Sequence, residues 1–486
     1  MRHCTANGRV ALIRKALVLM VSRYVAYAIS FVRGIWVAAV LGPGGYGVWG
    51  FLVLIQAYLK FLGLGVPTAI SRELALEKRP EHRDREIRGF LTVIALVTSV
   101  LAVSGFVVAD LFPDLFLRYR FHLYSPLVAM AAVVVILREF FFSLLRVYGA
   151  LHRISAMELL TAVALMITVP LSASGDLIRW LLLVTIGMGA LTVFVSTVRV
   201  PFRLGVTTSG PAVARAATLG LPFLIANFSV HLIAMSGRTV VSVFYTVEEM
   251  GYYSLATSIS NAVFLGLAAV AWALYPKLVE EVGAGSGHGQ VLERVDAIIV
   301  PMVMMTTLTS VALLPVLLLV LSDFEPARNA TMILLMSQGV FLASFSHRTL
   351  AHAQRHEGYI ARLAFASFLV NATAGLLLAF LDAHFTWIAV ATAVSLLGLS
   401  VAVTSYGGRL MGEPDRSDRF FRIMGLEAFL SMGVAVGLSV LGYSQSAGVV
   451  ALGLYVLLAR RRLSATVTVV SDLLRRARRP ASAGGA

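Results

Sequence analysis

The stretch LGPGGYGVWG, residues 41–50, interrupts an apolar run that is otherwise long enough to cross a membrane twice. Pro43 cannot extend a helix, and the two glycines that follow it tolerate backbone angles that other residues avoid. Tyr46 and Trp49 are aromatic residues of the kind enriched at membrane interfaces. The stretch therefore predicts a tight turn between two membrane-spanning helices, at residues 16–41 and 46–66.

The rest of the chain has the same membrane character. It has 486 residues, of which 58% are hydrophobic and 13% charged, and its mean hydropathy is +0.85. A soluble protein would carry about 25% charged residues, and a spanning helix needs about 20 mostly apolar residues. We expect an all-α polytopic membrane protein with about fourteen spans. The expected spans are residues 16–41, 46–66, 89–112, 126–149, 156–173, 178–198, 217–245, 252–275, 296–321, 329–350, 362–381, 386–407, 423–443 and 446–460.

The formal net charge of +15 is distributed unevenly along this plan. With the N-terminus in the cytoplasm, most Lys and Arg residues fall in cytoplasmic segments such as residues 72–88. The predicted outside loops hold only Arg118, Arg120, Arg179 and Arg328. This bias predicts a multi-pass protein of the cytoplasmic membrane with both termini cytoplasmic. The charge is then explained by topology and by anionic lipid heads, and no nucleic-acid partner is expected.

A second stretch, YTVEEMGYYS at residues 245–254, resembles the first turn and aligns Gly251 with Gly47. The two predicted turns are separated by an even number of spans, so both copies face the same way. This predicts two parallel six-helix repeats around a central cleft, related by an axis along the membrane normal. The expected parts are residues 1–200 for the first half, 201–407 for the second, 408–460 for two extra spanning helices, and 461–486 for a basic cytoplasmic tail.

Three segments carry a resemblance to a known family: LGPGGYGVWGFLVLIQAYLKFLGLGVPTAISRELA (41–75), GLPFLIANFSVHLIAMSGRTVVSVFYTVEEMGYYSLATSISNAV (220–263) and ALYPKLVEE (273–281). They resemble the polysaccharide and O-antigen flippases of the multidrug/oligosaccharidyl-lipid/polysaccharide exporter superfamily, which implies a MATE-like fold. The resemblance implies a flippase that moves an undecaprenyl-diphosphate-linked oligosaccharide from the inner to the outer leaflet by alternating access. It also implies membrane lipids, a glycan polymerase or glycosyltransferases as partners. One departure is Gly237, where the family often has an acidic residue.

Ionisable residues inside the predicted spans are the candidate site, because each costs about 3 kcal/mol in a membrane. Arg33, Arg238, Arg138 and Arg23 are the candidate ligands of a diphosphate, which guanidinium groups bind in bidentate fashion. Arg33 is expected about 12 Å from the outer end of the first span, and Arg23 about 27 Å. Snorkelling of Arg23 to the interface, and burial of Arg33 and Arg238 against backbone carbonyls, are the alternatives. Glu139 is either a coupling carboxylate or an ion-pair partner of an arginine.

Five further polar residues lie in apolar spans and are candidates to line the cavity, or to form hydrogen bonds between helices. They are Asn227, His231, Asn261, His347 and Asn371. Cys4 is the only cysteine, so we expect neither a disulfide nor a cysteine metal cluster. None of the lysines follows a glycine, so a phosphate-binding loop for ATP is absent from the sequence. We expect no catalytic residues, no metal and no cofactor, and leave proton or sodium coupling open.

Three other functions remain as alternatives. A small-molecule or drug exporter of the same superfamily would favour acidic residues in its cavity, whereas this chain offers mainly arginine. A lipid II flippase would use the same type of diphosphate, although the LGPGGYG turn favours the polysaccharide flippases. A membrane glycan polymerase or ligase is expected to have a large outside loop or acidic catalytic motifs, which this sequence lacks.

Overall fold

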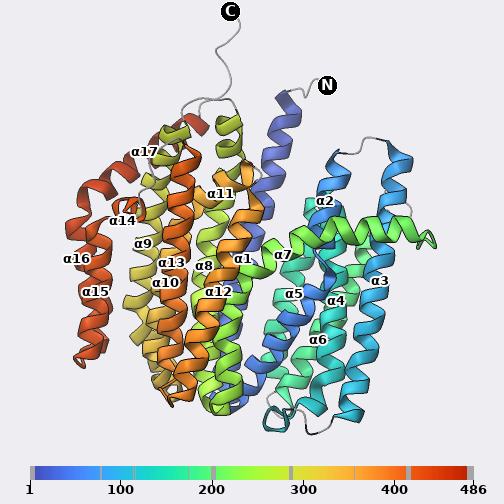
Figure 1. Ribbon diagram of the computed structural model, residues 1–486, viewed down its shortest axis with the longest axis horizontal. Helices are drawn as coiled ribbons and strands as arrows, with labels where there is room; N and C mark the ends of the chain where they lie inside the picture. The colour runs from blue at the N-terminus through green and yellow to red at the C-terminus, as the bar shows by residue number, and fades with distance from the viewer. Residues whose placement is uncertain are drawn as a thin grey trace, which may run out of the picture. The chain divides into compact units, whose positions relative to one another are not determined.

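The computed structural model is built from helices (Figure 1). It describes residues 6–76, 79–112, 114, 116–172, 175–198, 204–283, 288–354, 356–411 and 418–478, with side chains for most of them. Every element in these ranges is an α-helix or a 3-10 helix, so the predicted all-α class is confirmed. The chain divides into two compact units, residues 1–255 and 256–486. The predicted boundaries of the two repeats stay a prediction.

The first unit contains seven α-helices and the start of an eighth. They are α1 (Ala6–Lys60), α2 (Val66–Leu76), α3 (Pro80–Leu111), α4 (Phe121–Val147), α5 (Leu151–Leu171), α6 (Leu177–Thr197), α7 (Gly210–Phe244) and the beginning of α8 (Val247–Gly283), with short 3-10 turns at Phe61–Gly63 and Leu117–Tyr119. Helix α4 packs against α1, α2, α3 and α6 (Figure 1). Fully buried side chains such as Phe90 and Phe140 form the core where α2, α3, α4 and α7 meet.

The second unit contains the remaining helices. They are α9 (His288–Val320), the 3-10 helix Ser322–Ala327, α10 (Arg328–Ala343), α11 (Phe345–Ala353), α12 (Glu357–Phe380), α13 (Thr386–Leu410), α14 (Arg419–Met424), α15 (Leu426–Val440), α16 (Ser444–Leu458) and α17 (Arg460–Arg478). Helix α9 contacts α10, α16 and α17, and α13 contacts both α10 and α12. Helices α10 and α11 are bent by 45° relative to each other at Ser344.

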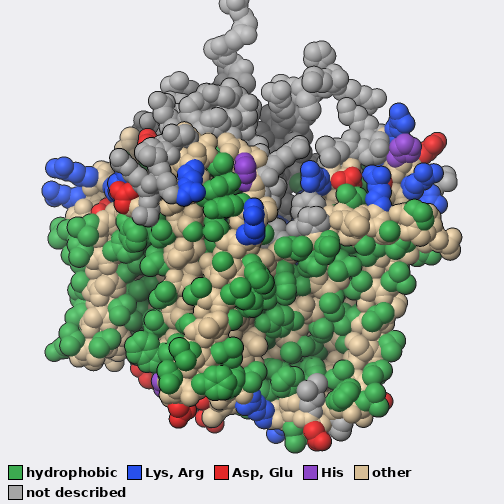
Figure 2. All heavy atoms as spheres, viewed as in Figure 1, with side chains coloured by type: hydrophobic (Ala, Val, Ile, Leu, Met, Phe, Trp, Pro, Cys, Tyr) green, Lys and Arg blue, Asp and Glu red, His purple; other side chains and the backbone are tan. Residues whose placement is uncertain are grey.

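Eight helices in the described part of the chain are long and apolar enough to cross a membrane, or nine if the bent pair α10 and α11 is one span. They include Val21–Leu74, Phe121–Val147 and Val295–Val320. Figure 2 shows apolar side chains covering the middle of the visible face, with charged side chains gathered towards the ends of the helices. A multi-pass membrane protein is therefore confirmed, while the count of fourteen spans stays a prediction.

The predicted break at residues 41–50 is present, but it is sharper than expected. A single residue, Gly42, leaves the helical conformation, with φ 62° and ψ 178°. Pro43 then opens the second half of α1, where it lacks only a donor that a helix start leaves unused. The four-residue loop that we expected is therefore a one-residue kink, because glycine reaches positive φ at little cost.

The second predicted turn, residues 245–254, is mostly helical, which corrects our expectation. Helix α7 ends at Phe244 and α8 already begins at Val247. Glu249 accepts hydrogen bonds from the backbone nitrogen of Thr246 at 2.9 Å and from its hydroxyl at 2.8 Å. The Thr246 hydroxyl in turn accepts from the backbone nitrogen of Glu249 at 3.2 Å. This capping box satisfies donors at the start of α8, so the acidic pair begins a helix rather than a loop.

The two similar stretches pack against each other within the first unit. A Cβ atom at Gly47 would collide with the carbonyl oxygen of Val247, and one at Gly251 would collide with the carbonyl oxygen of Pro43. The two contacts exchange under the alignment that places Gly251 on Gly47, because the same alignment places Val247 on Pro43. Glycine at both positions therefore permits a close, pseudo-symmetric approach of two helices, as small residues do between membrane helices.

Two predicted loops are also shorter than expected. The polar segment 72–88 was expected to be a loop, but α2 continues to Leu76 and α3 begins at Pro80. Proline suits the first helical turn, and Glu81 is favourable near a helix N-terminus. The chain between α3 and α4 includes the 3-10 helix Leu117–Tyr119, where Arg118 donates to the carbonyl of Val243 at 2.7 Å. Polar composition alone did not distinguish these helix ends from loops.

Tyr119 joins this 3-10 helix to the end of α7. Its hydroxyl donates to the carbonyl oxygen of Ser242 at 2.9 Å, and its ring stacks on Phe51 with centroids 4.1 Å apart. Burial raises the pKa of Tyr119 to about 12, so the hydroxyl stays protonated and remains a donor at neutral pH. The end of α7 is therefore tied to both α1 and the α3–α4 connection.

Candidate functional site

A cavity of about 370 Å3 lies between α1, α4 and α5 of the first unit. Its ionisable lining consists of four arginines and two glutamates, which give a formal surplus of two positive charges. They are Arg23, Arg33, Arg138, Arg146, Glu139 and Glu158. Ligand pockets usually measure about 300–1,000 Å3. This cavity is therefore large enough for a charged headgroup. All of its lining residues belong to the first unit.

Helical spacing explains how α1 presents its part of the lining. Arg23, Tyr27, Ser30 and Arg33 follow one another at intervals of three or four residues, which places them on one face of the helix. The kink at Gly42 ends this segment nine residues beyond Arg33, about 14 Å along the helix axis. Arg33 therefore lies well inside the spanning part of α1, as its position in the sequence predicted.

Arg23 forms the best-defined ion pair of the cavity. Its Nε and Nη2 atoms each donate to a carboxylate oxygen of Glu158 on α5, both at 2.9 Å. The exposed fractions are 33% for the Arg23 side chain and 23% for the Glu158 side chain. This two-point contact is the geometry in which a guanidinium binds a carboxylate or a phosphate. Arg23 therefore lines the cavity in a paired form, and its snorkelling to the interface stays a prediction.

Glu139 lies between two cations on the α4 side. Lys60 Nζ is 3.3 Å from Glu139 Oε1, and Arg138 Nη2 is 4.0 Å from the same oxygen. The neighbouring arginine thus reaches the carboxylate, although adjacent helical residues point about 100° apart. Arg138 Nε is buried without a hydrogen-bond partner among the described residues, and its guanidinium lies 5.9 Å from the Phe142 ring centroid. Glu139 is therefore an ion-pair partner here, and its coupling role stays a prediction.

A buried donor without a partner is costly, at about 1–3 kcal/mol. The Arg138 side chain as a whole is 29% exposed, so its other guanidinium nitrogens are the ones that a ligand in the cavity could contact. An anion would also be attracted by the surplus positive charge, since the apolar helices around the cavity screen charges less than water does. The arrangement favours an anion with several acceptor oxygens, such as a phosphate ester or diphosphate.

Arg238 occupies a different place from the other candidates. Its Nη2 atom donates to the backbone carbonyl of Gly50 at 2.7 Å, and its Nε atom is buried without a partner among the described residues. It is not among the residues that line the described cavity. Burial against a backbone carbonyl, the alternative considered for Arg238, is the arrangement observed. Its contact with substrate stays a prediction.

The five polar candidates are dispersed. The His231 ring lies 5.4 Å from that of Phe61, Asn261 is half-buried, and buried Asn371 accepts from Thr392 at 3.4 Å. His347 is buried beside Ser346, whose hydroxyl lies 3.0 Å from Nδ1. The side chain of Asn227 lies outside the described residues. Asn371 on α12 accepts from Thr392 on α13, and His347 on α11 accepts from Arg419 on α14, so both make hydrogen bonds between helices.

Two ionisable lining residues were missed as site candidates from the sequence. Glu158 stands near the start of the expected span 156–173, and Arg146 near the end of the expected span 126–149. Charges are common near the ends of membrane helices, where both residues lie in the expected plan. Their charge inside an expected span was the signal that could have marked them as site candidates. Their convergence depends on how α4 and α5 pack against α1, which no local pattern specifies.

Comparison with solved structures identifies the fold. A structure described as "Lipid II flippase MurJ, inward closed conformation" has a TM-score of 0.71 at 12% identity, covering 92% of this chain and 100% of that chain. An inward-facing MATE multidrug resistance transporter has a TM-score of 0.62 at 13% identity, covering 80% and 94%. A MOP superfamily transporter from Pyrococcus furiosus has a TM-score of 0.57 at 15% identity, covering 83% and 95%. The predicted MATE-like fold is confirmed, and the protein has the fold of MOP superfamily transporters.

The family follows from the sequence comparison. The model of the family described as "Polysaccharide biosynthesis protein" matches residues 12–281, more than half of the chain. The chain therefore belongs to the polysaccharide biosynthesis protein family, and the predicted resemblance is confirmed. No curated protein sequence matches it.

Proposed function

We propose that the protein is a flippase that moves a lipid-diphosphate-linked oligosaccharide from the inner to the outer leaflet of the cytoplasmic membrane. The observation that carries this proposal is the arginine-rich cavity between α1, α4 and α5, inside helices that are long and apolar enough to span a membrane. The family membership supports a role in polysaccharide biosynthesis. A diphosphate matches the surplus charge of the cavity and the bidentate geometry of its arginines.

The cavity residues would have distinct roles in this function. Arg33 and Arg138 would donate to the diphosphate oxygens, because neither makes an ion pair as close as that of Arg23 within the described cavity. Glu158 would hold Arg23 until the diphosphate competes for the same guanidinium. Exchange of a carboxylate for a phosphate keeps the charge of Arg23 paired throughout, so it avoids the cost of an isolated charge in an apolar setting.

The membrane potential would supply part of the driving force. A diphosphate carries about two negative charges, and each is worth about 2.3 kcal/mol per 100 mV of membrane potential. Outward movement from a negative interior is then favourable by about 4–5 kcal/mol per 100 mV. Export along this gradient requires neither ATP nor a cofactor, and proton or sodium coupling would add to it. Both termini are proposed to be cytoplasmic.

A lipid II flippase is the second candidate, because the structure described as a lipid II flippase aligns with 92% of this chain. A lipid II headgroup also carries a diphosphate, so the cavity chemistry fits both substrates. The family match favours the polysaccharide substrate. A drug exporter is less consistent with the site, since both carboxylates of the described cavity are paired with cations.

A deletion strain separates these functions. We expect it to accumulate a finished undecaprenyl-diphosphate-linked oligosaccharide on the inner leaflet, measured by mass spectrometry of extracted lipids, and to lose the corresponding surface glycan. Accumulation of lipid II would favour the second candidate. Accumulation of single repeat units outside would instead indicate a polymerase or ligase defect. No change in any glycan-lipid would contradict the proposal.

Complementation then connects the function to the cavity. We expect Arg33→Ala to be inserted in the membrane and yet fail to restore surface glycan. Arg85→Ala is the matched control, because Arg85 is an exposed arginine of α3 outside the cavity. Equal restoration by both variants would refute a role for Arg33. Pull-down of a glycan polymerase or glycosyltransferase of the same pathway would identify the partners.

A further inference from the structure

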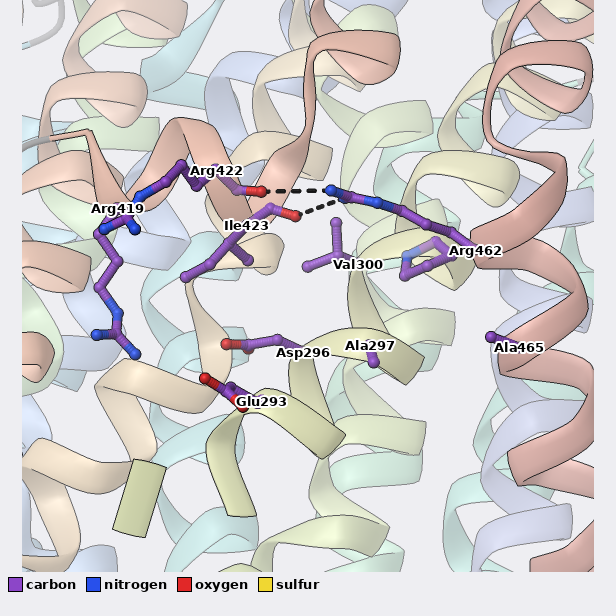
Figure 3. Close-up of a pocket in the computed structure, with 10 residues that line it drawn as sticks. Glu293, Asp296, Ala297, Val300, Arg419, Arg422, Ile423, Arg462 and Ala465 are labelled. Atoms are coloured by element: carbon purple, nitrogen blue, oxygen red, sulfur yellow. Dashed lines mark hydrogen bonds between the residues drawn. The ribbon is translucent and has the colours of Figure 1, made fainter. Parts of the chain in front are cut away.

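A second charged pocket lies in the second unit, between α9, α14 and α17. Its volume is about 360 Å3, and Figure 3 shows the side chains that line it. Glu293 and Asp296 come from α9, Arg419 and Arg422 from α14, and Arg462 from α17. No residue of this pocket belongs to the arginine-rich cavity of the first unit, so the two are separate candidate sites.

The charged side chains of this pocket form two groups. Figure 3 shows the carboxylates of Glu293 and Asp296 together, with the Arg419 guanidinium on their side. Arg462 instead reaches from α17 to the backbone of α14. Arg462 Nη1 donates to the carbonyl of Ile423 at 3.0 Å, and its Nε lies 3.0 Å from Glu427. The pocket therefore holds the two carboxylates and the Arg419 guanidinium on one side, and the Arg462 guanidinium on the other.

The inner wall is fixed by a buried hydrogen-bond chain. Asp296 and Arg419 are only 7% and 8% exposed. The Ser346 hydroxyl donates to Asp296, and Arg419 Nε donates to Nε2 of His347 at 3.3 Å. Because an arginine is always a donor, His347 Nε2 is an acceptor and the imidazole is neutral. Asp296 and Arg419 are therefore held in place by this chain of hydrogen bonds.

The outer wall has donors and an acceptor to spare. The described contact of Arg422 uses its Nε atom, which lies 3.3 Å from Asp418, and a guanidinium carries five N–H donors. Glu293 is exposed and forms no ion pair with a described residue. Both side chains can therefore bind a ligand without breaking the contacts that hold the pocket together.

The pocket lies where a spanning helix begins. The apolar span of α9 starts at Val295, between Glu293 and Asp296, and the ends of spanning helices are where lipid headgroups are expected. Val300, Pro301 and Ile423 continue the lining with apolar surface. Helix α17 is docked beside them through the Thr466 hydroxyl, which donates to the carbonyl of Ala297 at 2.8 Å. A ligand with a charged head and an apolar chain fits this change in chemistry.

We propose that this pocket is a binding site for a phospholipid whose headgroup contains both a phosphate and a primary ammonium, as in phosphatidylethanolamine. Arg422 binds the phosphate, Glu293 and Asp296 accept from the ammonium, and the acyl chains follow Val300 and Ile423. A lipid with only a negative headgroup has no cationic group to pair with the two carboxylates. A choline head has no N–H group to donate to them. The bound lipid would tie α17 to α9 and α14.

Native mass spectrometry of the full chain tests this site. The protein is reconstituted in nanodiscs with equal amounts of phosphatidylethanolamine, phosphatidylglycerol and phosphatidylcholine, then released into mild detergent and its retained lipids counted. We expect phosphatidylethanolamine to be retained about tenfold over either other lipid, which is the effect of one charge-assisted hydrogen bond. Glu293→Gln should remove this preference, and Arg422→Gln should reduce retention of all three lipids.

Matched controls are Glu81→Gln and Arg362→Gln, which change the same charges at exposed positions outside the pocket and should retain the wild-type preference. Equal retention of phosphatidylglycerol by the wild type would overturn the proposal. So would an unchanged preference in Glu293→Gln. Binding of soluble phosphoethanolamine with no retained lipid would show a soluble ligand instead. Failure of the glycan-lipid assays would leave this site unaffected, because the two pockets share no residue.

Discussion

Replacement of Glu158 by glutamine should strengthen the binding of a diphosphate, although it removes an ion pair from the protein. In the structure Glu158 occupies the guanidinium of Arg23 through two hydrogen bonds of 2.9 Å each. Glutamine has nearly the same shape but no charge. The substitution Glu158→Gln therefore frees Arg23 for the ligand and raises the surplus of the cavity by one positive charge.

The size of the effect follows from Coulomb's law. A carboxylate about 6 Å from a phosphate repels it by about 2.8 kcal/mol at an effective dielectric constant of 20. The Arg23 and Glu158 side chains are 33% and 23% exposed, so water screens part of this energy. Allowing for half of it leaves about 1.4 kcal/mol, or about tenfold in the dissociation constant. Loss of the ion pair should cost about 1 kcal/mol of stability.

The assay is titration of the purified protein in nanodiscs with undecaprenyl diphosphate, at low and high salt. The tenfold gain should shrink at about 1 M salt, where the Debye length is about 3 Å. Translocation should become slower than in the wild type, because a more tightly bound headgroup leaves the cavity less readily. Glu81→Gln is the control, since it removes the same charge from an exposed position on α3.

Unchanged or weaker binding of undecaprenyl diphosphate to Glu158→Gln would refute this reasoning. It would mean that Arg23 supports the fold of the first unit and does not meet the ligand. A gain of equal size in Glu81→Gln would show that only the net charge of the protein matters.

Three further substitutions test the structure around the site. Gly47→Ala should lower stability by about 1–3 kcal/mol in a thermal unfolding assay, because the added methyl group would collide with the backbone of Val247. Gly34→Ala should be neutral, because a methyl group there meets nothing within 4 Å. Equal melting temperatures of the two variants would contradict this. Arg238→Ala should cost about 1–3 kcal/mol by leaving the carbonyl of Gly50 without its donor, and wild-type stability would contradict the observed contact. Glu249→Ala should cost about 1 kcal/mol through the lost cap, and no change would contradict the capping box.

Local chemistry in the sequence predicted much of the fold. The kink at Gly42 was predictable because Pro43 cannot extend the preceding helix and glycine reaches positive φ at little cost. The start of α8 could also have been recognised, since Thr246 and Glu249 have the spacing of a capping box. We expected a turn there because the stretch aligns with the one at residues 41–50. Helix boundaries depend on such caps more than on polarity.

The candidate site was predicted only in part, for a physical reason. The depth of Arg33 follows from its distance along one helix, which the sequence contains. The pairing of Arg23 with Glu158 joins residues 135 positions apart, so it depends on how α1 packs against α5. Arg238 illustrates the same limit, because its position in the span was predictable but its contact with Gly50 was not. Sequence therefore placed the charges on helices, and tertiary packing selected the ones that share a cavity.

Translocation by the purified protein tests the central claim most directly. Liposomes with and without the protein would be loaded with a fluorescent undecaprenyl-diphosphate-linked oligosaccharide in both leaflets, and the outer-leaflet fraction would be quenched over time. The account predicts that the protein moves the inner-leaflet lipid outward under an inside-negative potential, and that Arg33→Ala and Arg138→Ala abolish this movement while Arg85→Ala preserves it. Movement at the wild-type rate in both cavity variants would contradict the account.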